Sequence, residues 1–414
     1  MTAINTLAPA TPWRATAERD LHASEAELHR VREAAAAVGQ ALAADVLERD
    51  RANAEPFAEV ALLRQAGLIN LLVPTEFGGQ GGHWESALEA VRIVSRADGS
   101  IGQLLAYHYI NQASIAFYAP AEEQGRWWEL AAKNQWLWAD SVNPTDPDLI
   151  LTPTATGWVL NGTKRYSTGS SVAEVIVVNA LVAGGEREGQ VLAFVVERER
   201  EGVTLGGDWD NLGQRLTGSG SVSYSDVAVT EADILGLVTD EPIASLITPA
   251  IQLAFGGFYL GVAEGALERG RELLLARKNA WFLSRDETYA ADPIFQRRLG
   301  ELKAHTAAVA ALAEKLFRRF DAEIDLDNAY TREHRGDFAV AIAELKVAAT
   351  DVALEVTSGI FDVTGTSSTA NSVGLDLAWR NVRTHSLHDP VDYKKIEVGA
   401  YFLTGATQPI SLYT

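Results

Sequence analysis

The segment GWVLNGTKRYSTG, residues 157–169, indicates β structure in the middle of the chain. Its dipeptide Asn161-Gly162 is the strongest short signal for a hairpin turn, because such a turn needs residues that tolerate a positive φ. The surrounding sequence continues the pattern, with β-branched runs separated by glycine and acidic turns. We therefore predict a hairpin at Asn161-Gly162 within a compact antiparallel β domain, residues 136–238. Further expected strands lie within 173–182, 189–198 and 220–229.

Helical periodicity replaces this pattern on both sides of the β domain. Residues 24–135 repeat apolar side chains at helical spacing, and Ser24 is the expected N-cap of the first helix. Residues 239–414 contain long amphipathic stretches with short connections, which predict a helical bundle. Residues 1–23 lack such a pattern and are expected to form a flexible tail. The predicted fold class is therefore α+β, with a helical domain, an antiparallel β domain and a four-helix bundle in this order.

The composition excludes several classes of site and partner. The 414 residues carry a net charge of −20, whereas nucleic acids and anionic membranes attract clustered lysine and arginine. The absence of cysteine rules out disulfides, thiolate catalysis and cysteine-ligated metal centres. The uncharged stretch 243–263 is long enough to cross a bilayer, but it contains Pro249 and Gln252 and lacks basic flanks, so we expect a buried bundle helix. No secretory signal pattern is present, and we expect a cytoplasmic protein that binds neither nucleic acid nor membrane.

Titratable residues cluster in RTHSLHDPVDYK, at 383–394. His385 and His388 lie close together in this stretch, and Asp389 follows directly. An imidazole donates and accepts protons near neutral pH, and a neighbouring carboxylate can fix its tautomer, so acid–base chemistry is one interpretation. A metal pair is a second, with His108 or Asp389 as a third ligand, although no HExxH motif is present. Structural capping within the bundle is a third.

The order of the three regions resembles the acyl-CoA dehydrogenase fold, and four motifs carry this resemblance along nearly the whole chain. The stretch at 63–81 resembles the family's N-terminal signature, in which a glycine-rich turn follows a proline and a glutamate. LNGTKRYSTG at 160–169 is similar to the family's LNGxKxWITNG motif, whose hydroxyl and aromatic side chains lie against the flavin ring. The stretch at 212–229 ends in the family's DVxV pattern, and WRNVRTHSLHDPVDYK at 379–394 stands where the dehydrogenases carry RDARxxxIYEGT.

The last motif departs from the dehydrogenases at the position of their catalytic base. Acyl-CoA dehydrogenases often use the glutamate of IYEGT to remove the proton α to the thioester. Here His388 and Asp389 stand at the YE positions, and aspartate is one methylene shorter than glutamate. Such a displacement of the carboxylate is expected to slow proton abstraction roughly a hundredfold. Instead, RTHSLHDPV at 383–391, LLAYHYINQ at 104–112 and the stretch at 246–267 resemble the flavin-dependent monooxygenases of the dibenzothiophene monooxygenase and sulfone monooxygenase type.

This resemblance implies a two-component flavin-dependent monooxygenase and a homotetramer. Members of this branch use O2 and reduced flavin, usually FMN supplied by a separate NAD(P)H-dependent flavin reductase, so we expect FMN, with FAD as the alternative. The C4a-hydroperoxide formed there survives only where water is excluded, and would oxygenate an apolar organosulfur compound of the dibenzothiophene kind. The alternatives are an FAD-dependent acyl-CoA dehydrogenase with Asp389 as base, an N-hydroxylating monooxygenase of the same fold, and a scaffold without flavin.

The family's roles, carried onto matching positions, imply catalytic, flavin-binding and substrate-binding residues and no metal ligand. His388 is expected to hold and protonate the peroxide. His385 and Asp389 would orient it, and Thr168 would contact the flavin. Arg277 would reach the flavin phosphate, often across a subunit boundary. The expected flavin-binding residues are Tyr107, Asp140, Ser141, Tyr166, Ser167, Trp209, Ser219, Arg277 and Ser367. The expected substrate pocket comprises His108, Asn111, Trp136, Phe255 and Phe258.

Overall fold

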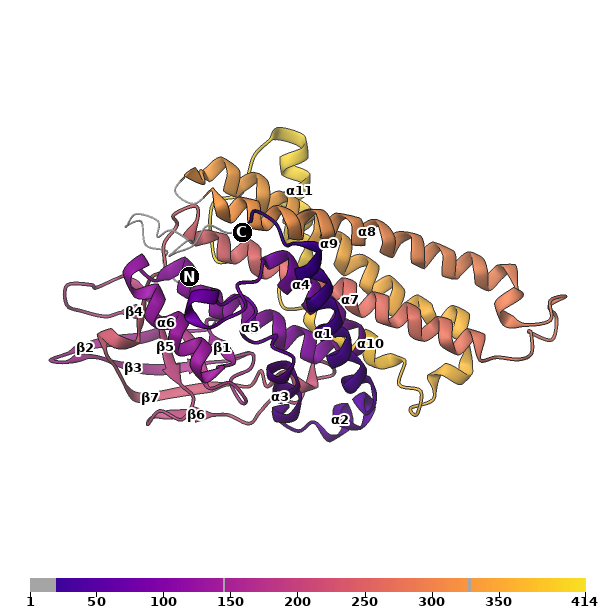
Figure 1. Cartoon of the computed structure of the whole chain (residues 1–414), viewed down its shortest axis with the longest axis horizontal. Helices are drawn as coiled ribbons and strands as arrows, with labels where there is room; N and C mark the ends of the chain where they lie inside the picture. Colours follow the sequence, from indigo (N-terminus) through magenta and orange to yellow (C-terminus); the bar gives the residue numbers. More distant parts are fainter. Residues whose placement is uncertain (1–19, 144–145, 327–328) are drawn as a thin grey trace.

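The computed structural model describes residues 20–143, 146–326 and 329–414, which form three neighbouring regions (Figure 1). A sheet lies at one end of the molecule, and long helices extend to the other end. Helices α4 (Trp84–Ala97) and α5 (Gly99–Tyr118) lie between them. The α+β fold class predicted from the sequence is confirmed.

The N-terminal helices are capped by polar side chains. The hydroxyl of Ser24 accepts a hydrogen bond from the backbone N–H of Glu27 at 3.1 Å, so the predicted N-cap is confirmed. Asp98 separates α4 from α5, and its carboxylate accepts a bond from the backbone N–H of Ser100 at 2.9 Å. Residues 1–19 of the predicted tail lie outside the described residues. The other helices of this region are α1 (Glu25–Ala43), α2 (Val46–Ala52), α3 (Phe57–Gln65) and α6 (Ala121–Asn134).

The described residues of the middle region fold into one mixed sheet of eight strands. The strands are β1 (Trp138–Ser141), β2 (Leu149–Thr154), β3 (Gly157–Lys164), β4 (Val175–Val182), β5 (Val191–Glu197), β6 (Val203–Leu205), β7 (Val222–Val229) and β8 (Ile234–Leu237). Their order is β6-β7-β3-β2-β4-β5-β8, with β1 paired to β4. Because β4 runs parallel to both β1 and β2, the prediction of a wholly antiparallel domain is wrong for these two pairs. Side chains alternate in the same way in both arrangements, so the sequence pattern does not distinguish them.

Asn161 and Gly162 do not form the predicted hairpin turn. They lie inside β3, where the pairing with β7 shifts register between Leu160 and Gly162. Gly162 has a φ of 132°, and a Cβ there would come within 2.7 Å of the Leu149 side chain. The side-chain oxygen of Asn161 accepts a bond from the backbone N–H of Asp226 at 2.9 Å. The extra residue at this shift lies on β7, where Asp226 has a φ of 54°, so Asn161 and Gly162 lie opposite a β-bulge and not in a turn.

The C-terminal region is a helical bundle built around α7. Its helices are α7 (Ile247–Leu275), α8 (Pro293–Asp325), α9 (Arg332–Thr364), α10 (Asp376–His385) and α11 (Val391–Thr404). By length and composition α7 could cross a membrane, but 83% of its most apolar window is buried, and it packs mainly against α9 and α4. Pro249 lies in its first turn, where proline is tolerated. The prediction of a buried bundle helix is therefore confirmed.

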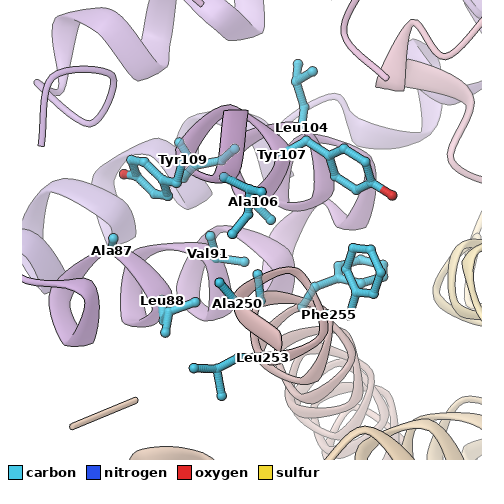
Figure 2. Packing of buried hydrophobic residues seen from close by; sticks show 14 of the residues in the cluster. Ala87, Leu88, Val91, Leu104, Ala106, Tyr107, Tyr109, Ala250, Leu253 and Phe255 are labelled. Atoms are coloured by element: carbon cyan, nitrogen blue, oxygen red, sulfur yellow. The ribbon is translucent and has the colours of Figure 1, made fainter. Parts of the chain in front are cut away.

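Figure 2 shows the apolar core where α4, α5 and α7 meet. The helices α4 and α7 approach closely, because a Cβ at Gly261 would lie only 2.2 Å from the carbonyl oxygen of Arg92. Tyr107 of α5 and Phe255 of α7 lie at the edge of this core, with the Tyr107 hydroxyl pointing away from it. The aliphatic side chains labelled there are Ala87, Leu88, Val91, Leu104, Ala106, Ala250 and Leu253.

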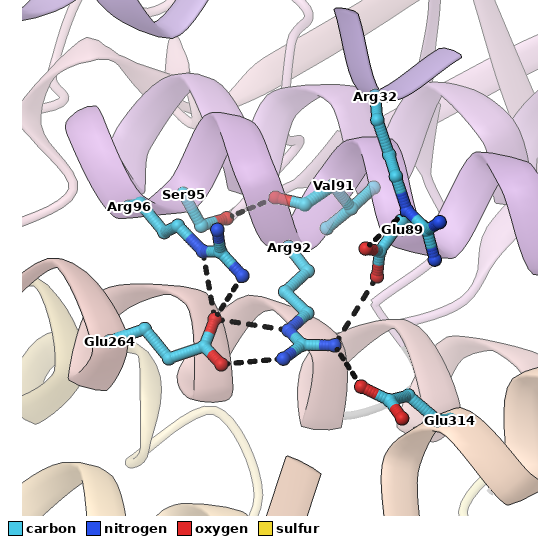
Figure 3. Close-up of polar contacts among 8 residues, drawn as sticks. All are labelled: Arg32, Glu89, Val91, Arg92, Ser95, Arg96, Glu264 and Glu314. Carbon is cyan, nitrogen blue, oxygen red and sulfur yellow. Dashed lines mark hydrogen bonds and ion pairs between the residues drawn. The ribbon is translucent and has the colours of Figure 1, made fainter. Parts of the chain in front are cut away.

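Arg92 ties α4, α7 and α8 together through a largely buried ion network (Figure 3). Its guanidinium donates to Glu264 of α7 at 2.5 and 3.0 Å and to Glu314 of α8 at 3.0 Å. A third carboxylate, Glu89, accepts at 3.3 Å. Burial alone would raise the pKa of Glu264, but the Arg92 and Arg96 guanidiniums hold it below its ordinary value. The network therefore depends on both arginines remaining charged beside Glu264.

Arg92→Met is expected to lower the free energy of unfolding by about 2–3 kcal/mol, because Glu264 stays buried with one of its two cationic partners gone. The loss stays below that of a fully buried pair, since Arg96 still contacts Glu264 at 2.8 Å. Glu314→Gln is the matched control, because the Glu314 side chain is 61% exposed and its removal should cost less than about 1 kcal/mol. Urea unfolding measures the difference. Equal unfolding midpoints would show that the network adds no stability.

Candidate active site

A cavity of about 540 Å³ lies where the sheet region, α5, α7 and the end of α10 meet. Its volume falls in the range of small-molecule sites. A second hollow of about 1030 Å³ between α6 and β8 contains none of the predicted site residues. The predicted residues that line the first cavity are Tyr107, Asn111, Asp140, Tyr166, Thr168, Trp209, Ser219, His385 and His388. Lining residues that the sequence did not indicate include Gln103, Ile110, Thr248, Gln252, Thr384 and Tyr413.

The two predicted imidazoles stack on one wall of this cavity, with ring centroids 5.5 Å apart and planes 13° apart. Phe255 packs edge-on against both rings. His385 is buried, and its Nδ1 shares a 2.8 Å hydrogen bond with the Tyr259 hydroxyl. Burial lowers the pKa of His385 well below its ordinary value, so the ring is neutral at neutral pH. Among the described residues the Nε2 of His385 has no hydrogen-bond partner, which leaves a polar atom for a bound molecule.

The buried ion pair of Asp389 and Lys346 contacts His388 and orients its ring. The Nδ1 of His388 lies 3.3 Å from Asp389 Oδ1, which also accepts a 3.1 Å bond from Lys346 Nζ of α9. Burial would raise the pKa of Asp389, but His388 and Lys346 hold it well below its usual range. Lys346 is fully buried, and this burial lowers its pKa although Asp389 opposes the shift. With Nδ1 engaged, Nε2 is the atom of His388 that remains for a molecule in the cavity.

A second wall comes from the sheet and its loops. Thr168 follows β3, and its hydroxyl accepts a bond from Ser219 at 3.0 Å. Tyr166, with a φ of 61°, meets Trp209 edge to face at a centroid distance of 6.4 Å. Tyr107 links the two walls, because its hydroxyl bonds Thr168 and its ring lies 6.2 and 6.5 Å from the two imidazoles. The hydroxyls of Thr168 and Ser219 and the rings of Tyr166 and Trp209 therefore line the same cavity as the imidazole pair.

Asp140 of β1 is a buried carboxyl group that lines the cavity and has no ion-pair partner within the described part of the chain. The side-chain amide of Asn111 donates to Asp140 Oδ2 at 3.5 Å. The backbone N–H of Asp140 donates to the carbonyl oxygen of Thr168 at 3.4 Å. Burial raises the pKa of Asp140 to about 7. Near neutral pH a fraction of this carboxyl is therefore protonated and able to donate a hydrogen bond.

Asp140→Asn is expected to make the stability less dependent on pH. The pKa of Asp140 is about 7 in the fold against an ordinary value of 3.8, so the stabilisation by the neutral form is complete below pH 3.8 and is lost as the pH rises through about 7. The variant should therefore melt a few degrees above the wild type at about pH 8, with a smaller difference at about pH 5. Thermal unfolding across this range measures the effect. Parallel curves for the two proteins would contradict the assignment.

Four of the predicted flavin-binding residues do not line the cavity. Ser141 and Ser167 lie behind the second wall, where their hydroxyls share a 3.2 Å hydrogen bond. Arg277 follows the end of α7 and hydrogen-bonds Ser367. The cavity contacts the start of α7 at Thr248, roughly 40 Å away along the helix axis. Arg277 and Ser367 therefore lie away from this cavity, and the contact of Arg277 with a flavin phosphate across a subunit boundary stays a prediction.

The structure also corrects the expected substrate pocket, because four of its five residues do not line the cavity. His108 bonds a backbone carbonyl oxygen through Nε2 at 2.8 Å, and its Nδ1 accepts from the backbone N–H of Trp138 at 3.2 Å. Burial lowers the pKa of His108 to about 4, so it is a satisfied core imidazole with no nitrogen left for a metal or substrate. Trp136 packs against Trp138. Phe255 and Phe258 are buried and support the imidazole pair.

The sequence did not indicate two buried residues that hold the imidazoles. Tyr259 and Lys346 contact the cluster from 126 and 43 residues away in the chain, and periodicity does not pair such distant positions. One signal was present for Lys346. It is a lone lysine among apolar residues of a predicted helix, and a buried lysine requires a carboxylate partner.

Comparisons with known proteins agree with this architecture. The chain matches the family models "Acyl-CoA dehydrogenase, N-terminal domain" at 24–135, "middle domain" at 143–227 and "C-terminal domain" at 253–393. It is 35% identical to the "Probable FMNH2-dependent monooxygenase SfnC" of Pseudomonas putida, over 89% of this chain and 93% of the relative. It is 36% identical to the dibenzothiophene monooxygenase of Rhodococcus erythropolis, over 87% and 90% of the two chains.

Solved structures show the same relationship. FMN-bound TdsC from Paenibacillus sp. A11-2 is 33% identical with a TM-score of 0.88, covering 93% of this chain and all of that one. Methanesulfinate monooxygenase MsuC from Pseudomonas fluorescens is 32% identical with a TM-score of 0.89, covering 92% and 99%. Butyryl-CoA dehydrogenase from Megasphaera elsdenii, at 19% identity, shares the fold alone. The chain therefore belongs to the flavin-dependent monooxygenases of the acyl-CoA dehydrogenase fold, in the branch that contains the dibenzothiophene monooxygenases.

Proposed function

We propose that this protein is the oxygenase of a two-component system that transfers one oxygen atom from O2 to an apolar organosulfur compound. Its FMN would be reduced by a separate NAD(P)H-dependent flavin reductase. The observation that carries the proposal is the imidazole pair on the cavity wall, with His385 Nε2 unpartnered among the described residues and His388 held by Asp389. The relatives named FMNH2-dependent or solved with FMN and indole support the cofactor and an aromatic substrate.

The second wall of the cavity fits a flavin. A flat ring with a polar edge suits the aromatic side chains of Tyr166 and Trp209, together with the hydroxyls of Thr168 and Ser219. Asp140 adds a carboxyl group that is partly protonated near neutral pH and can donate to an electron-rich ring. Reduced FMN held there would react with O2 and supply the oxygen atom for transfer, which requires a site without free water.

His388 and His385 on the imidazole wall would supply the proton donor and the hydrogen-bond donor of the reaction. With reduced FMN in the cavity, His388 would donate a proton from Nε2 to the oxygen that stays on the flavin and would take up the proton that the transferred oxygen releases, while Asp389 accepts from Nδ1. His385 stays neutral. When the Tyr259 hydroxyl donates to Nδ1, the Nε2 of His385 carries the hydrogen and donates into the cavity. His388 is therefore the ring that would transfer a proton, whereas His385 would donate a hydrogen bond and keep its hydrogen.

The substrate side needs no carboxylate base, because a thioether sulfur accepts oxygen without losing a proton. Asp389 does not line the cavity, and its lowered pKa makes it a weak base, which argues against the acyl-CoA dehydrogenase alternative. N-hydroxylation would use the same oxygen donor and is the nearest variant. Apolar side chains suited to a ring sulfide line the cavity at Ile110, Val177, Ile247, Ile251, Leu387 and Leu412.

We also propose a homotetramer in the cytoplasm. Large apolar side chains are exposed on the single chain and would be covered by assembly. The requirement for NAD(P)H and a reductase favours a cytoplasmic location. The exposed residues include Trp281, Phe282 and Leu283 beyond α7 and Phe402 and Leu403 at the end of α11.

The function is tested with purified protein, an NADH-dependent flavin reductase, FMN and a panel containing dibenzothiophene, dimethyl sulfide, an aromatic amine and indole. The expected result is a mass gain of one oxygen on the sulfur compounds, and only when O2 and the reductase are both present. If only the amine is oxygenated, the atom that accepts the oxygen is nitrogen and not sulfur. Anaerobic bleaching of bound flavin by an acyl-CoA, without any oxygenated product, would reject the monooxygenase assignment.

A further inference from the structure

The segment that follows α11 returns to the active-site cavity. Gly405, with a φ of 70°, ends the helix, and residues 405–414 contain neither helix nor strand. We call these residues the strap. Its residues 406–409 are exposed, and the next residues return to the cavity, where Leu412 and the partly exposed Tyr413, at 38%, form part of the lining. Leu412 also packs against the apolar cluster beneath the sheet. An irregular segment therefore supplies part of the wall of the site.

Two buried cations hold the end of the strap. Lys394 of α11 is 6% exposed, and its Nζ donates to the carbonyl oxygen of Tyr413 at 2.8 Å and to Glu397 at 2.8 Å. Arg335 of α9 is 2% exposed and donates to the carbonyl oxygen of Thr414. Burial of a charged group is unfavourable unless hydrogen bonds replace water. Each of these cations donates a hydrogen bond to a carbonyl oxygen of the strap. Detaching the strap would therefore leave each buried cation with one hydrogen-bond partner fewer.

Tyr413 lines the same cavity as His385 and His388. Burial raises the pKa of Tyr413, and the nearby Asp389 carboxylate raises it further. Asp389 also holds His388, so Tyr413 and His388 interact with the same carboxylate. A molecule positioned for oxygen transfer beside His388 would therefore have the Tyr413 ring as a neighbour.

We propose that Tyr413 and Leu412 are specificity-determining residues for aromatic thioethers, and that Lys394 and Arg335 are positioning residues that hold them at the cavity. This inference rests on the proposed function and deepens it. An aromatic ring at the wall favours a flat ring sulfide through edge or face contacts, which a small aliphatic sulfide cannot make. The cations act only through the strap carbonyls.

The first test compares dibenzothiophene with dimethyl sulfide as substrates. Tyr413→Ala should raise the KM for dibenzothiophene about tenfold and leave kcat, the KM for dimethyl sulfide and the Kd for FMN within about twofold. Tyr413→Phe should restore the KM for dibenzothiophene. Tyr393→Ala is the matched control, because Tyr393 is 72% exposed and does not line the cavity. Equal changes for the two sulfides, or no change for either, would overturn the assignment.

The second test needs no turnover. Lys394→Met should increase amide hydrogen exchange in residues 405–414 about tenfold, because the segment loses one of its two anchors. Lys395→Met is the matched control, since the Lys395 side chain is 43% exposed and contacts Asp351 instead. Unchanged exchange in Lys394→Met would reject the anchoring role. If the wild type oxygenates no sulfide but the strap loosens as expected, the proposed function fails while the anchoring stands.

Discussion

His388→Phe is expected to reduce oxygenated product by about 10²–10⁴-fold, the usual worth of a positioned general acid. Phenylalanine keeps the ring and its contact with Phe255, but it cannot hold a proton at the position of Nε2. The His388 side chain is 39% exposed, but its loss leaves the buried Asp389 with Lys346 as its remaining charged partner, so the melting temperature should fall by a few degrees while the protein stays folded. NADH consumption should continue, because the reductase works separately, and the reduced oxygen should then accumulate as hydrogen peroxide.

The control for this prediction is His29→Phe. His29 lies on α1 with a 73% exposed side chain, far from the cavity lining, and its loss should change neither product nor peroxide. Product and peroxide are measured together by mass spectrometry and a peroxidase assay. Normal product formation by His388→Phe would show that this imidazole is not the proton donor. Loss of product with loss of the folded state would instead point to a structural role.

Lys346→Met is expected to lower the free energy of unfolding by about 3–5 kcal/mol, because it leaves the Asp389 carboxylate buried without its lysine. The side chains of Lys346 and Asp389 are 1% and 7% exposed, so water cannot replace the lost partner. Replacing both partners, in Lys346→Met/Asp389→Asn, removes the unpaired charge and should recover most of the loss. Urea unfolding of the two single variants and the double variant gives the coupling free energy. Additive losses in the double variant would show that the two groups do not form a pair.

The pH dependence gives a second check on this pair. The pKa of Asp389 lies below its ordinary value of 3.8 in the fold, so its contribution to stability is present above pH 3.8 and is lost as the pH falls through its folded pKa. In Lys346→Met the pKa of Asp389 rises and this contribution shrinks. The difference in stability between the wild type and the variant should therefore narrow as the solution is acidified toward pH 3.8 and below.

The sequence predicts those parts of the site whose members lie close together in the chain. His385, His388 and Asp389 form one short cluster, and Thr168 stands in a stretch that resembles the family's LNGxKxWITNG motif, so both could be found before the structure. Tyr259 and Lys346, which hydrogen-bond His385 and Asp389 of this cluster, come from other helices. Which helix faces meet is decided by packing of the whole bundle, and a single sequence does not contain that information in readable form.

The wrong predictions also concern tertiary contacts that a single sequence does not specify. The dipeptide Asn161-Gly162 indicates a position of positive φ, and here Gly162 adopts one within a strand that faces a β-bulge of β7. Phe255 and Phe258 were expected in the pocket because they are aromatic, but their face of α7 supports the imidazoles, while Gln252 lines the cavity. Helical spacing predicts that one face is buried. It does not show whether that face meets a core or a cavity.

The proposed function requires reduced flavin and substrate to meet the imidazole pair in this cavity. The most direct measurement is a crystal structure of the protein with FMN and dibenzothiophene. We expect the flavin ring against Thr168, with the Nε2 of His388 facing the space between the flavin edge and the sulfur atom. FMN bound elsewhere, or an imidazole pair separated from the flavin by protein, would contradict it.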